Sequence, residues 1–151
     1  MSLTIRSATP ADAERIAAFN RHLAEETERK SLDAPTVLAG VLALLDAPEN
    51  GQYFVAESGG DVVGQLLITY EWSDWRNGRF WWIQSVYVAA SHRRQGIFSA
   101  LYGHVAALAN SDPAVCGLRL YVEESNARAL ETYRALDMRP TGYHVLEVEF
   151  D

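Results

Sequence analysis

The chain has 151 residues, of which 48% are hydrophobic and 22% charged, as in an average soluble globular protein. This composition excludes disordered, collagen-like and fibrous proteins, and the length fits a single domain over residues 1–151. Lysine and arginine number 13 against 20 aspartate and glutamate residues, so the net charge is −7, which argues against nucleic acid or an anionic membrane as a partner.

The N-terminal third predicts one strand and two helices. Leu3 and Ile5 alternate with polar residues, as in a short strand. The run Thr9–Asp12 is typical of a helix start, because threonine caps helices and proline suits their first position. Apolar residues then fall on one face of each of two helices: Ile16, Phe19 and Leu23 in the first, and Val37, Leu38, Val41, Leu42 and Leu45 in the second.

The middle of the chain changes to the pattern of strands. Tyr53–Glu57 and Val62–Trp72 are joined by Ser58–Asp61, whose two glycines suit the tight turn of a hairpin. Arg79–Val88, which is rich in β-branched and aromatic residues, predicts the next strand.

The C-terminal third returns to helices and strands in alternation. We expect a helix after Gly96, a strand over Cys116–Val122, a helix capped by Ser125, and a last strand over Tyr143–Phe150. The apolar faces of the two helices carry Ile97, Leu101, Val105 and Leu108 in the first, and Ala129, Leu130, Tyr133 and Leu136 in the second.

This element order predicts an α+β (mixed α/β) fold with helices on the faces of one sheet. The strands over residues 79–88 and 116–122 are separated by a helix. We therefore expect them to be parallel, with a right-handed crossover between them.

The most informative segment is Val86–Val88 followed by Arg93–Ser99, where a strand runs through a glycine-containing loop into a helix. Backbone N–H groups at a helix N-terminus lack intrahelical partners and attract anions such as phosphate. Gly96 allows a ligand to approach the backbone, and the arginines can add charged hydrogen bonds. An ordinary helix start with solvated arginines fits this segment equally well. The glycine patterns of P-loop and dinucleotide-binding proteins are absent.

Two motifs together resemble the GNAT superfamily of acyl-CoA-dependent N-acyltransferases. The family's first signature, Arg/Gln-x-x-Gly-x-Gly/Ala, corresponds here to Arg93-Arg94-Gln95-Gly96-Ile97-Phe98. Its second, Asn-x-x-Ala-x-x-x-Tyr-x-x-x-Gly-Phe, corresponds to Asn126 and Ala129, then Tyr133, then Asp137-Met138. The agreement in element order extends from Thr4 to the C-terminus.

The resemblance implies a mixed, mostly antiparallel sheet with a V-shaped splay between two parallel central strands, into which acetyl-CoA enters as co-substrate. Asn126 would contact the arm of acetyl-CoA, and Tyr133 would protonate the leaving thiolate as general acid. Acetyl-CoA would also be bound by the strand residues Val86, Tyr87 and Val88, and by the loop residues Arg93, Arg94, Gln95, Gly96, Ile97, Phe98 and Ser99.

The chain departs from the family pattern at three positions. Phe98 replaces a small residue at the helix start, which is tolerable if its side chain points away from the pyrophosphate. Asp137 stands where the family often has glycine, and aspartate adopts left-handed backbone geometry more readily than most residues. Met138 for phenylalanine is an ordinary apolar exchange.

The general base is harder to find by sequence. Glu26 is our first choice, because it lies on the helical hairpin that borders the acceptor site in this family. Each single carboxylate also reads as a solvated charge, although a group of them suits a cationic amine. The other candidates near such an acidic, aromatic entrance are Glu25, Glu28, Glu71 and Asp74, with Trp72, Trp75 and the water-orienting Gln84.

We expect no metal site, because the four histidines (His22, His92, His104 and His144) show no ligand spacing with cysteine or carboxylates. Cys116, the single cysteine, reads as a small buried residue rather than a nucleophile. One cysteine cannot form an internal disulfide, the start of the chain lacks a signal-peptide pattern, and no apolar run approaches the ~20 residues of a membrane span. A cytoplasmic location is therefore expected.

The leading functional prediction is transfer of an acetyl group from acetyl-CoA to a primary amine by direct attack in a ternary complex. The acceptor would be a small molecule or a peptide, and a cationic one suits the acidic surface. One alternative is a non-catalytic acyl-CoA-binding sensor, which the presence of Tyr133 argues against. Another is an interaction domain without a cofactor site. Adjacent Trp81 and Trp82 must face opposite sides of the sheet, so one of them could line the acceptor pocket or a homodimer contact.

Overall fold

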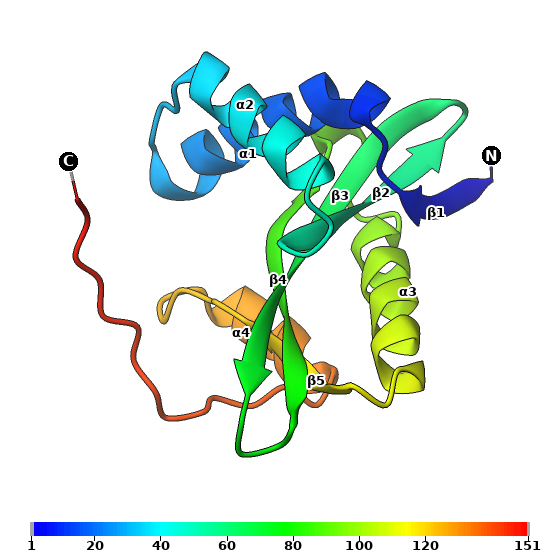
Figure 1. The fold of residues 1–151 in the computed structure, drawn as a ribbon. Helices are drawn as coiled ribbons and strands as arrows, with labels where there is room; N and C mark the ends of the chain where they lie inside the picture. The colour runs from blue at the N-terminus through cyan, green and yellow to red at the C-terminus, as the bar shows by residue number, and fades with distance from the viewer. Residues whose placement is uncertain (1, 151) are drawn as a thin grey trace. The chain divides into compact units, whose positions relative to one another are not determined.

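The computed structural model describes residues 2–150 and divides the chain into two compact units, one up to Leu120 and one from Tyr121 onward (Figure 1). The strands of the first unit are β1 (Leu3–Ser7), β2 (Gly51–Ser58), β3 (Asp61–Ser73), β4 (Gly78–Val88) and β5 (Val115–Leu120). Its helices are α1 (Ala13–Glu28), α2 (Ala34–Leu45) and α3 (Ile97–Ser111), with short 3-10 turns η1 (Pro10–Asp12) and η2 (Ala90–His92).

The first unit contains one mixed five-stranded sheet with the order β1-β2-β3-β4-β5. The first four strands are antiparallel neighbours, whereas β5 lies parallel to β4 and is reached through α3. The fold-class prediction is therefore confirmed. The two glycines of the β2–β3 turn have positive φ angles, +59° at Gly59 and +87° at Gly60, as the hairpin requires.

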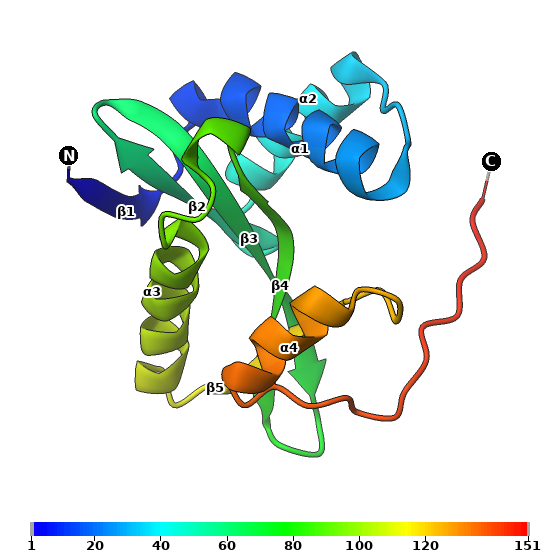
Figure 2. The same ribbon diagram turned by 180° about the vertical axis from the view of Figure 1, so that it is seen from behind.

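Helices cover both faces of this sheet: α3 lies on one face, and α1 with α2 on the other (Figures 1 and 2). Each face has its own apolar core, because strand residues alternate between the two sides. On the α3 face, Leu66 and Ile68 of β3 pack with Ile97, Leu101 and Val105 of the helix. The core of the other face is formed by Ala13, Ile16 and Ala17 of α1, Val41 of α2, and Tyr53, Val55 and Leu67 of the sheet.

Strand β4 separates from β5 partway along its length. The parallel pairing runs from Arg79↔Val115 to Ile83↔Leu120 and ends there, while β4 continues to Val88 beside β3. The second half of β4 consequently has a strand neighbour on only one side within the described residues. This is the expected splay between the two parallel strands.

The start of α3 sits closely against β3 at Gly64. A Cβ atom built on Gly64 would lie 2.9 Å from Cγ2 of Ile97 and 3.5 Å from Cδ1 of Leu101. The helix can approach this closely because the glycine has no side chain. Gly64 thus helps to fix the position of the helix N-terminus.

The expected helix start is confirmed: Thr9 is the N-cap of η1, and Asp12 accepts hydrogen bonds from the Thr9 N–H (2.8 Å) and from Arg6.

Two local expectations in the first unit need correction. Leu108 is 40% exposed, and Ala109 is buried in its place, because the helical repeat turns away from the sheet near the end of α3. Cys116 is exposed rather than buried, since β5 is an edge strand.

The second unit contains one helix, α4 (Ala127–Ala135). Its N-cap is Asn126, whose side chain accepts a hydrogen bond from the Ala129 N–H at 3.1 Å, so the expected cap at Ser125 is wrong by one residue. Asp137 ends the helical segment with φ +64°, in the left-handed geometry expected of it, and the Met138 N–H donates to the Tyr133 carbonyl at 3.0 Å.

The expected last strand over Tyr143–Phe150 is not formed. Residues 143–150 have no regular secondary structure, and no backbone pairing of this segment occurs among the described residues. The alternating pattern places apolar residues on one side of the segment, but a strand also needs a neighbouring strand to hydrogen-bond with its backbone groups. Within residues 2–150, no helix is long and apolar enough to span a membrane.

The contact at Gly64 makes a stability prediction. Gly64→Ala should lower the free energy of unfolding by about 1–3 kcal/mol, because the methyl group would overlap Ile97. Gly103→Ala in α3 is the matched control. A Cβ at position 103 meets no atom within 4 Å, and alanine has a higher helix propensity than glycine, so this variant should not lose stability. Urea unfolding measures both. Equal stability of the two variants would contradict the close approach of α3 to β3.

Candidate active site

The candidate site is centred on a bulge in β4. The pairing with β3 shifts register between Gln65 and Leu67, and Ser85 opposite them has φ +50°, in the left-handed region. A bulge of this kind bends a strand and redirects its backbone. It lies directly after Ile83, the last β4 residue paired with β5.

Beyond the bulge, alternate residues of β4 present their backbone groups away from β3. The Ala89 N–H donates to the Val63 carbonyl of β3 at 2.8 Å, which directs the backbone of Ala89 and Tyr87 toward β3. The N–H and C=O groups of Val86 and Val88 consequently face the opposite side, where β5 has separated. Within residues 2–150 these groups form an open strand edge, apart from the Val88 carbonyl, which accepts from Nε of Arg93 at 3.0 Å.

A buried amide network holds the bulge in place. Gln65 of β3 is fully buried and donates from Nε2 to the Ser85 carbonyl at 3.0 Å and to Oδ1 of Asn20 at 2.7 Å. Asn20 of α1 in turn donates to the Tyr53 hydroxyl at 3.1 Å. Burial raises the pKa of Tyr53, so this hydroxyl stays protonated. The network ties α1, β2, β3 and β4 together at the point where the strand edge opens.

Gln65 is not among the site residues predicted from the sequence. The signal was present, because Gln65 is the only polar residue between Val62 and Ile68 apart from a glycine. Buried polar side chains in such a run are nearly always hydrogen-bonded and often position something specific.

Glu26, Tyr87 and Arg93 form a second cluster next to the open edge. The Tyr87 hydroxyl donates to Oε2 of Glu26, and Nη2 of Arg93 donates to Oε1 of the same carboxylate at 2.7 Å. The Arg93 guanidinium also lies 5.3 Å from the centre of the Tyr87 ring. The structure thus joins the expected base, on α1, to two expected cofactor-binding residues, on β4 and in the loop that follows.

These contacts determine the protonation of the cluster. The hydrogen bond from Tyr87, followed by the one from Arg93, lowers the pKa of Glu26. Burial, followed by the hydrogen bond to Glu26, raises the pKa of Tyr87. At neutral pH the cluster therefore holds an ionised carboxylate, a protonated phenol and a charged guanidinium.

The loop after β4 turns into α3 through two left-handed residues, Arg94 (φ +63°) and Gly96 (φ +77°), the latter being the N-cap. The first intrahelical hydrogen bond runs from the Ala100 N–H to the Gly96 carbonyl at 3.0 Å. The N–H groups of Ile97, Phe98 and Ser99 precede this first intrahelical hydrogen bond and lie at the positive end of the helix dipole. This local geometry suits an anion such as phosphate.

The side chains around this loop leave the backbone accessible. Arg94, Gln95 and Gly96 are exposed, and a Cβ at Gly96 would meet no atom within 4 Å. The Phe98 ring lies along the helix beside Tyr102, with ring centres 6.0 Å apart. The bulky residue at position 98 is therefore accommodated on the side of the helix.

The remaining expected site residues lie in the second unit. The Asn126 side chain caps α4, as described above. Tyr133 is partly buried on α4, and burial raises its pKa, so the phenol is protonated at neutral pH.

Two of the other candidates, Glu71 and Gln84, are engaged with neighbouring side chains. Glu71 accepts from Arg119 at 3.0 Å and from Nε1 of Trp82 at 2.7 Å, and the Gln84 amide donates to the Thr69 hydroxyl at 2.6 Å. Among the tryptophans expected near the acidic entrance, Trp72 is 60% exposed and Trp75 is 83% exposed, both at the β3–β4 turn.

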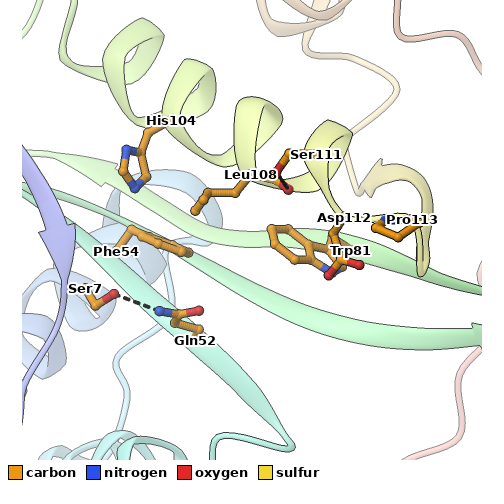
Figure 3. Close-up of a pocket in the computed structure, with 9 residues that line it drawn as sticks. All are labelled: Ser7, Gln52, Phe54, Trp81, His104, Leu108, Ser111, Asp112 and Pro113. Carbon is orange, nitrogen blue, oxygen red and sulfur yellow. Dashed lines mark hydrogen bonds between the residues drawn. The ribbon is translucent and has the colours of Figure 1, made fainter.

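A hollow of about 700 Å³ lies on the α3 face of the sheet, away from the β4 bulge (Figure 3). It is bordered by residues of β1, β2, β4 and the second half of α3, together with Asp112 and Pro113. Trp81 lines it, whereas none of the expected catalytic or cofactor-binding residues does. His104 contacts Phe54 edge-on there, with ring centres 5.4 Å apart, which is a packing role. Among residues 2–150, no group of three His, Cys, Asp or Glu side chains could hold a metal ion.

Comparison with known proteins assigns this strand–loop–helix to a family. The Acetyltransferase (GNAT) family model matches residues 16–138, which include both sequence motifs and the clusters around the β4 bulge. The chain belongs to the GNAT acetyltransferase family. Enzymes of this family use acetyl-CoA and acetylate amines.

Individual relatives agree with this assignment. The chain is 34% identical over 113 residues to the thialysine N-epsilon-acetyltransferase of Bos taurus, a match that covers 72% of this chain and 62% of the bovine protein. It also resembles the crystal structure of a possible acetyltransferase from Clostridium difficile 630, with 44% identity, a TM-score of 0.93, and coverage of 100% of this chain and 99% of the other.

A more distant structure, a predicted acetyltransferase from Clostridium acetobutylicum, was crystallised with acetyl-CoA. It shares 17% identity and a TM-score of 0.76, over 98% of this chain and 96% of the other. At this identity the two proteins share the fold.

The hydrogen bonds of Gln65 predict that the stability of this GNAT protein depends on this one buried side-chain amide. Gln65→Leu should lower the free energy of unfolding by roughly 1–3 kcal/mol, because the Ser85 carbonyl and the Asn20 side chain would lose their donor in a buried place. The control is Gln52→Leu, which removes an exposed hydrogen bond to Ser7. Urea unfolding measures the stability of both variants. If Gln65→Leu lowers the free energy of unfolding no more than Gln52→Leu does, Gln65 does not stabilise the bulge.

Proposed function

We propose that this protein transfers an acetyl group from acetyl-CoA to a primary amine by direct attack in a ternary complex. The observation that carries the proposal is the open edge of β4 at Val86–Val88, which leads directly into the exposed N-terminus of α3. An extended amide-containing ligand can pair with such an edge as an added strand. Its anionic end would then reach the helix N-terminus.

The described residues fit acetyl-CoA in this role. The backbone groups of Val86 and Val88 would bind the amides of its pantetheine arm beside Tyr87. The accessible backbone of the loop would bind the pyrophosphate, assisted by the charge of Arg93 and Arg94. Gln95, Gly96, Ile97, Phe98 and Ser99 would contribute backbone contacts there, and Asn126 would contact the arm.

Acetyl-CoA supplies a thioester that a neutral amine can attack. We propose that the Val88 N–H, on the open side of β4, donates to the thioester oxygen and stabilises negative charge as it develops. Glu26 is proposed as the base that takes the proton of the ammonium group, directly or through water. Its lowered pKa means that the carboxylate is ionised and able to accept a proton at neutral pH, although it makes Glu26 a weak base.

Tyr133 is proposed as the general acid that protonates the leaving thiolate. Burial raises its pKa, so the proton is present when the thiolate leaves. In this proposal the two compact units act together as one acetyltransferase domain over residues 1–151.

The acceptor is proposed to be a primary amine on a small molecule or a peptide. The bovine relative acetylates an ε-amine according to its name, and the net charge of −7 favours a cationic acceptor here as well. A cytoplasmic site of action is proposed too, because the exposed thiol of Cys116 suits a reducing compartment.

Binding of acetyl-CoA is tested by thermal unfolding with and without the ligand, with NADH and ATP as controls. A ligand at about 100 times its dissociation constant adds roughly 2.7 kcal/mol, which should raise Tm by roughly 5 to 10 °C in a domain of this size. A shift with acetyl-CoA alone is expected, followed by thiol release with a panel of amines that includes thialysine, lysine and polyamines. No shift at millimolar acetyl-CoA would overturn the proposal, and a shift without turnover on any amine would favour the acyl-CoA sensor.

The role of Tyr133 is tested by Tyr133→Phe. Turnover should fall by roughly ten- to ten-thousand-fold, the range of general-acid effects, with the acetyl-CoA thermal shift retained. Tyr143→Phe is the matched control, because that tyrosine is 74% exposed in the C-terminal segment and has no proposed role in the reaction. Unchanged turnover in Tyr133→Phe would remove this residue from the mechanism.

A further inference from the structure

Arg93 belongs to the loop that leads into α3, but its side chain turns back toward β4 and α1. Nε donates to the Val88 carbonyl at 3.0 Å, and Nη2 donates to Oε1 of Glu26 at 2.7 Å. The guanidinium carbon lies 5.3 Å from the centre of the Tyr87 ring, which is within the range of a cation–π interaction. The guanidinium therefore contacts a backbone carbonyl, a carboxylate and an aromatic ring, all outside its own loop.

Tyr87 gives these contacts a rigid support. The residue is only 6% exposed, and its ring packs against Phe19 and His22 of α1, with ring centres 5.1 Å and 6.1 Å apart. Its hydroxyl donates to Oε2 of Glu26. Both oxygens of the Glu26 carboxylate are thus held, one by a buried tyrosine and the other by Arg93.

The position of Glu26 in α1 makes this support necessary. The last turn of the helix contains Glu25, Glu26 and Glu28 and no basic residue. Carboxylates at this end of a helix repel one another and meet the negative end of its dipole. Lys30, just after the helix, pairs with Glu28 at 3.4 Å, whereas Glu26 pairs with Arg93 from a loop 67 residues away.

The two arginines of the loop are consequently placed differently. Arg94 follows Arg93 with φ +63° and is exposed beside the accessible loop backbone. The charge of Arg93 also lies near this loop, but two of its hydrogen-bond donors are directed to Glu26 and to the Val88 carbonyl. Arg94 is therefore the arginine whose side chain is available to an anion at the start of α3.

We propose that the side chains of Arg93 and Tyr87 are positioning residues for Glu26. Arg93 then serves the acceptor half of the reaction, while Arg94 and the loop backbone bind the pyrophosphate. This role rests on the proposed function, in which Glu26 is the base and the Val88 N–H donates to the thioester oxygen. Because Arg93 binds both Glu26 and Val88, one planar group fixes the base relative to the residue that supplies the N–H donor.

The relative position of these two groups matters because they act on different atoms of one reaction. The base takes a proton from the amine, and the N–H stabilises negative charge on the thioester oxygen. An error of about 1 Å in such an arrangement can lower the rate about a hundredfold. Loss of the Arg93 side chain should therefore lower turnover more than it lowers the affinity for acetyl-CoA.

The first test compares Arg93→Gln with Arg94→Gln, which remove the same charge from adjacent positions. Kinetics are measured by thiol release with the best acceptor of the amine panel. Arg93→Gln should lower kcat about ten- to a hundredfold, with little change in the KM for acetyl-CoA. Arg94→Gln should mainly raise the KM for acetyl-CoA. The reverse pattern would show that the Arg93 side chain serves acetyl-CoA binding, and would overturn the proposal.

The acetyl-CoA thermal shift tests the same division of roles without turnover. Arg93→Gln should keep most of the wild-type shift, whereas Arg94→Gln should reduce it. The Tm of each variant without ligand is measured as well, so that a loss of stability is separated from a loss of binding. An equal reduction of the shift in the two variants overturns the proposal.

A double-mutant cycle tests whether Arg93 acts through Glu26. In a Glu26→Gln background, Arg93→Gln should change kcat by no more than about twofold, because the group it positions is already absent. Glu14→Gln is the control background, since Glu14 is exposed in the first turn of α1. There Arg93→Gln should have its full effect. An equally full effect in the Glu26→Gln background overturns the proposal.

Conservative variants test the individual contacts. Tyr87→Phe keeps the buried ring and removes only the hydroxyl that donates to Glu26, so kcat should fall while the acetyl-CoA thermal shift is retained. Arg93→Lys keeps the charge but cannot form both hydrogen bonds, and should restore only part of the kcat lost in Arg93→Gln. Unchanged kcat in Tyr87→Phe would remove Tyr87 from this role.

These measurements separate failure of the positioning role from failure of the proposed function. A wild-type protein with neither an acetyl-CoA shift nor turnover overturns both. An active wild type whose kcat is insensitive to Arg93→Gln overturns the positioning role alone. If Glu26→Gln leaves kcat unchanged, Glu26 is not the base, and the positioning role fails although acetyl transfer stands.

Discussion

The structure depends on one interruption of strand pairing. Ser85 takes a left-handed backbone in the middle of β4, and from there onward the strand keeps β3 as its neighbour but loses β5. β5 ends at Leu120, opposite Ile83, and the bulge follows within two residues. The bulge and the end of β5 together leave the backbone of Val86 and Val88 open on the side away from β3. Gln65 stabilises this arrangement because its buried amide binds the bulge carbonyl directly.

Most of the fold could be predicted because local patterns and long-range packing agree in it. The strand patterns predicted the bounds of β2, β3 and β4 to within two residues, and Gly59 and Gly60 predicted the hairpin turn between β2 and β3. The prediction of a last strand over Tyr143–Phe150 was wrong, because an alternating pattern indicates only that one face of the segment could be buried. It does not indicate whether another strand is available to pair with it. Cys116 was misplaced for a related reason: an apolar strand at the edge of a sheet still exposes part of its side chains.

The candidate site was predictable only as far as its motifs extend. The loop from Arg93 to Ser99 could be recognised from its Arg-x-x-Gly motif in combination with the second motif at Asn126 and Tyr133, since a helix N-terminus alone fits an ordinary helix start equally well. The contact between Glu26 and Arg93 could not, since 67 residues separate them and only the fold brings α1 beside the loop. Gln65 could not be predicted either, because a single amide in an apolar strand belongs to no recognisable motif. Its role depends on its hydrogen bond to the Ser85 carbonyl, which only the structure shows.

The pairing of β1 also has a consequence for the order in which the chain can fold during synthesis. β1 has one strand neighbour, β2, and their register joins Leu3 to Ser58. β1 consequently cannot pair until more than fifty further residues have left the ribosome. The α1–α2 hairpin, in contrast, can form from local contacts alone. Because loop closure across that distance comes before any gain from pairing, the N-terminal strand joins the sheet after the helices that follow it.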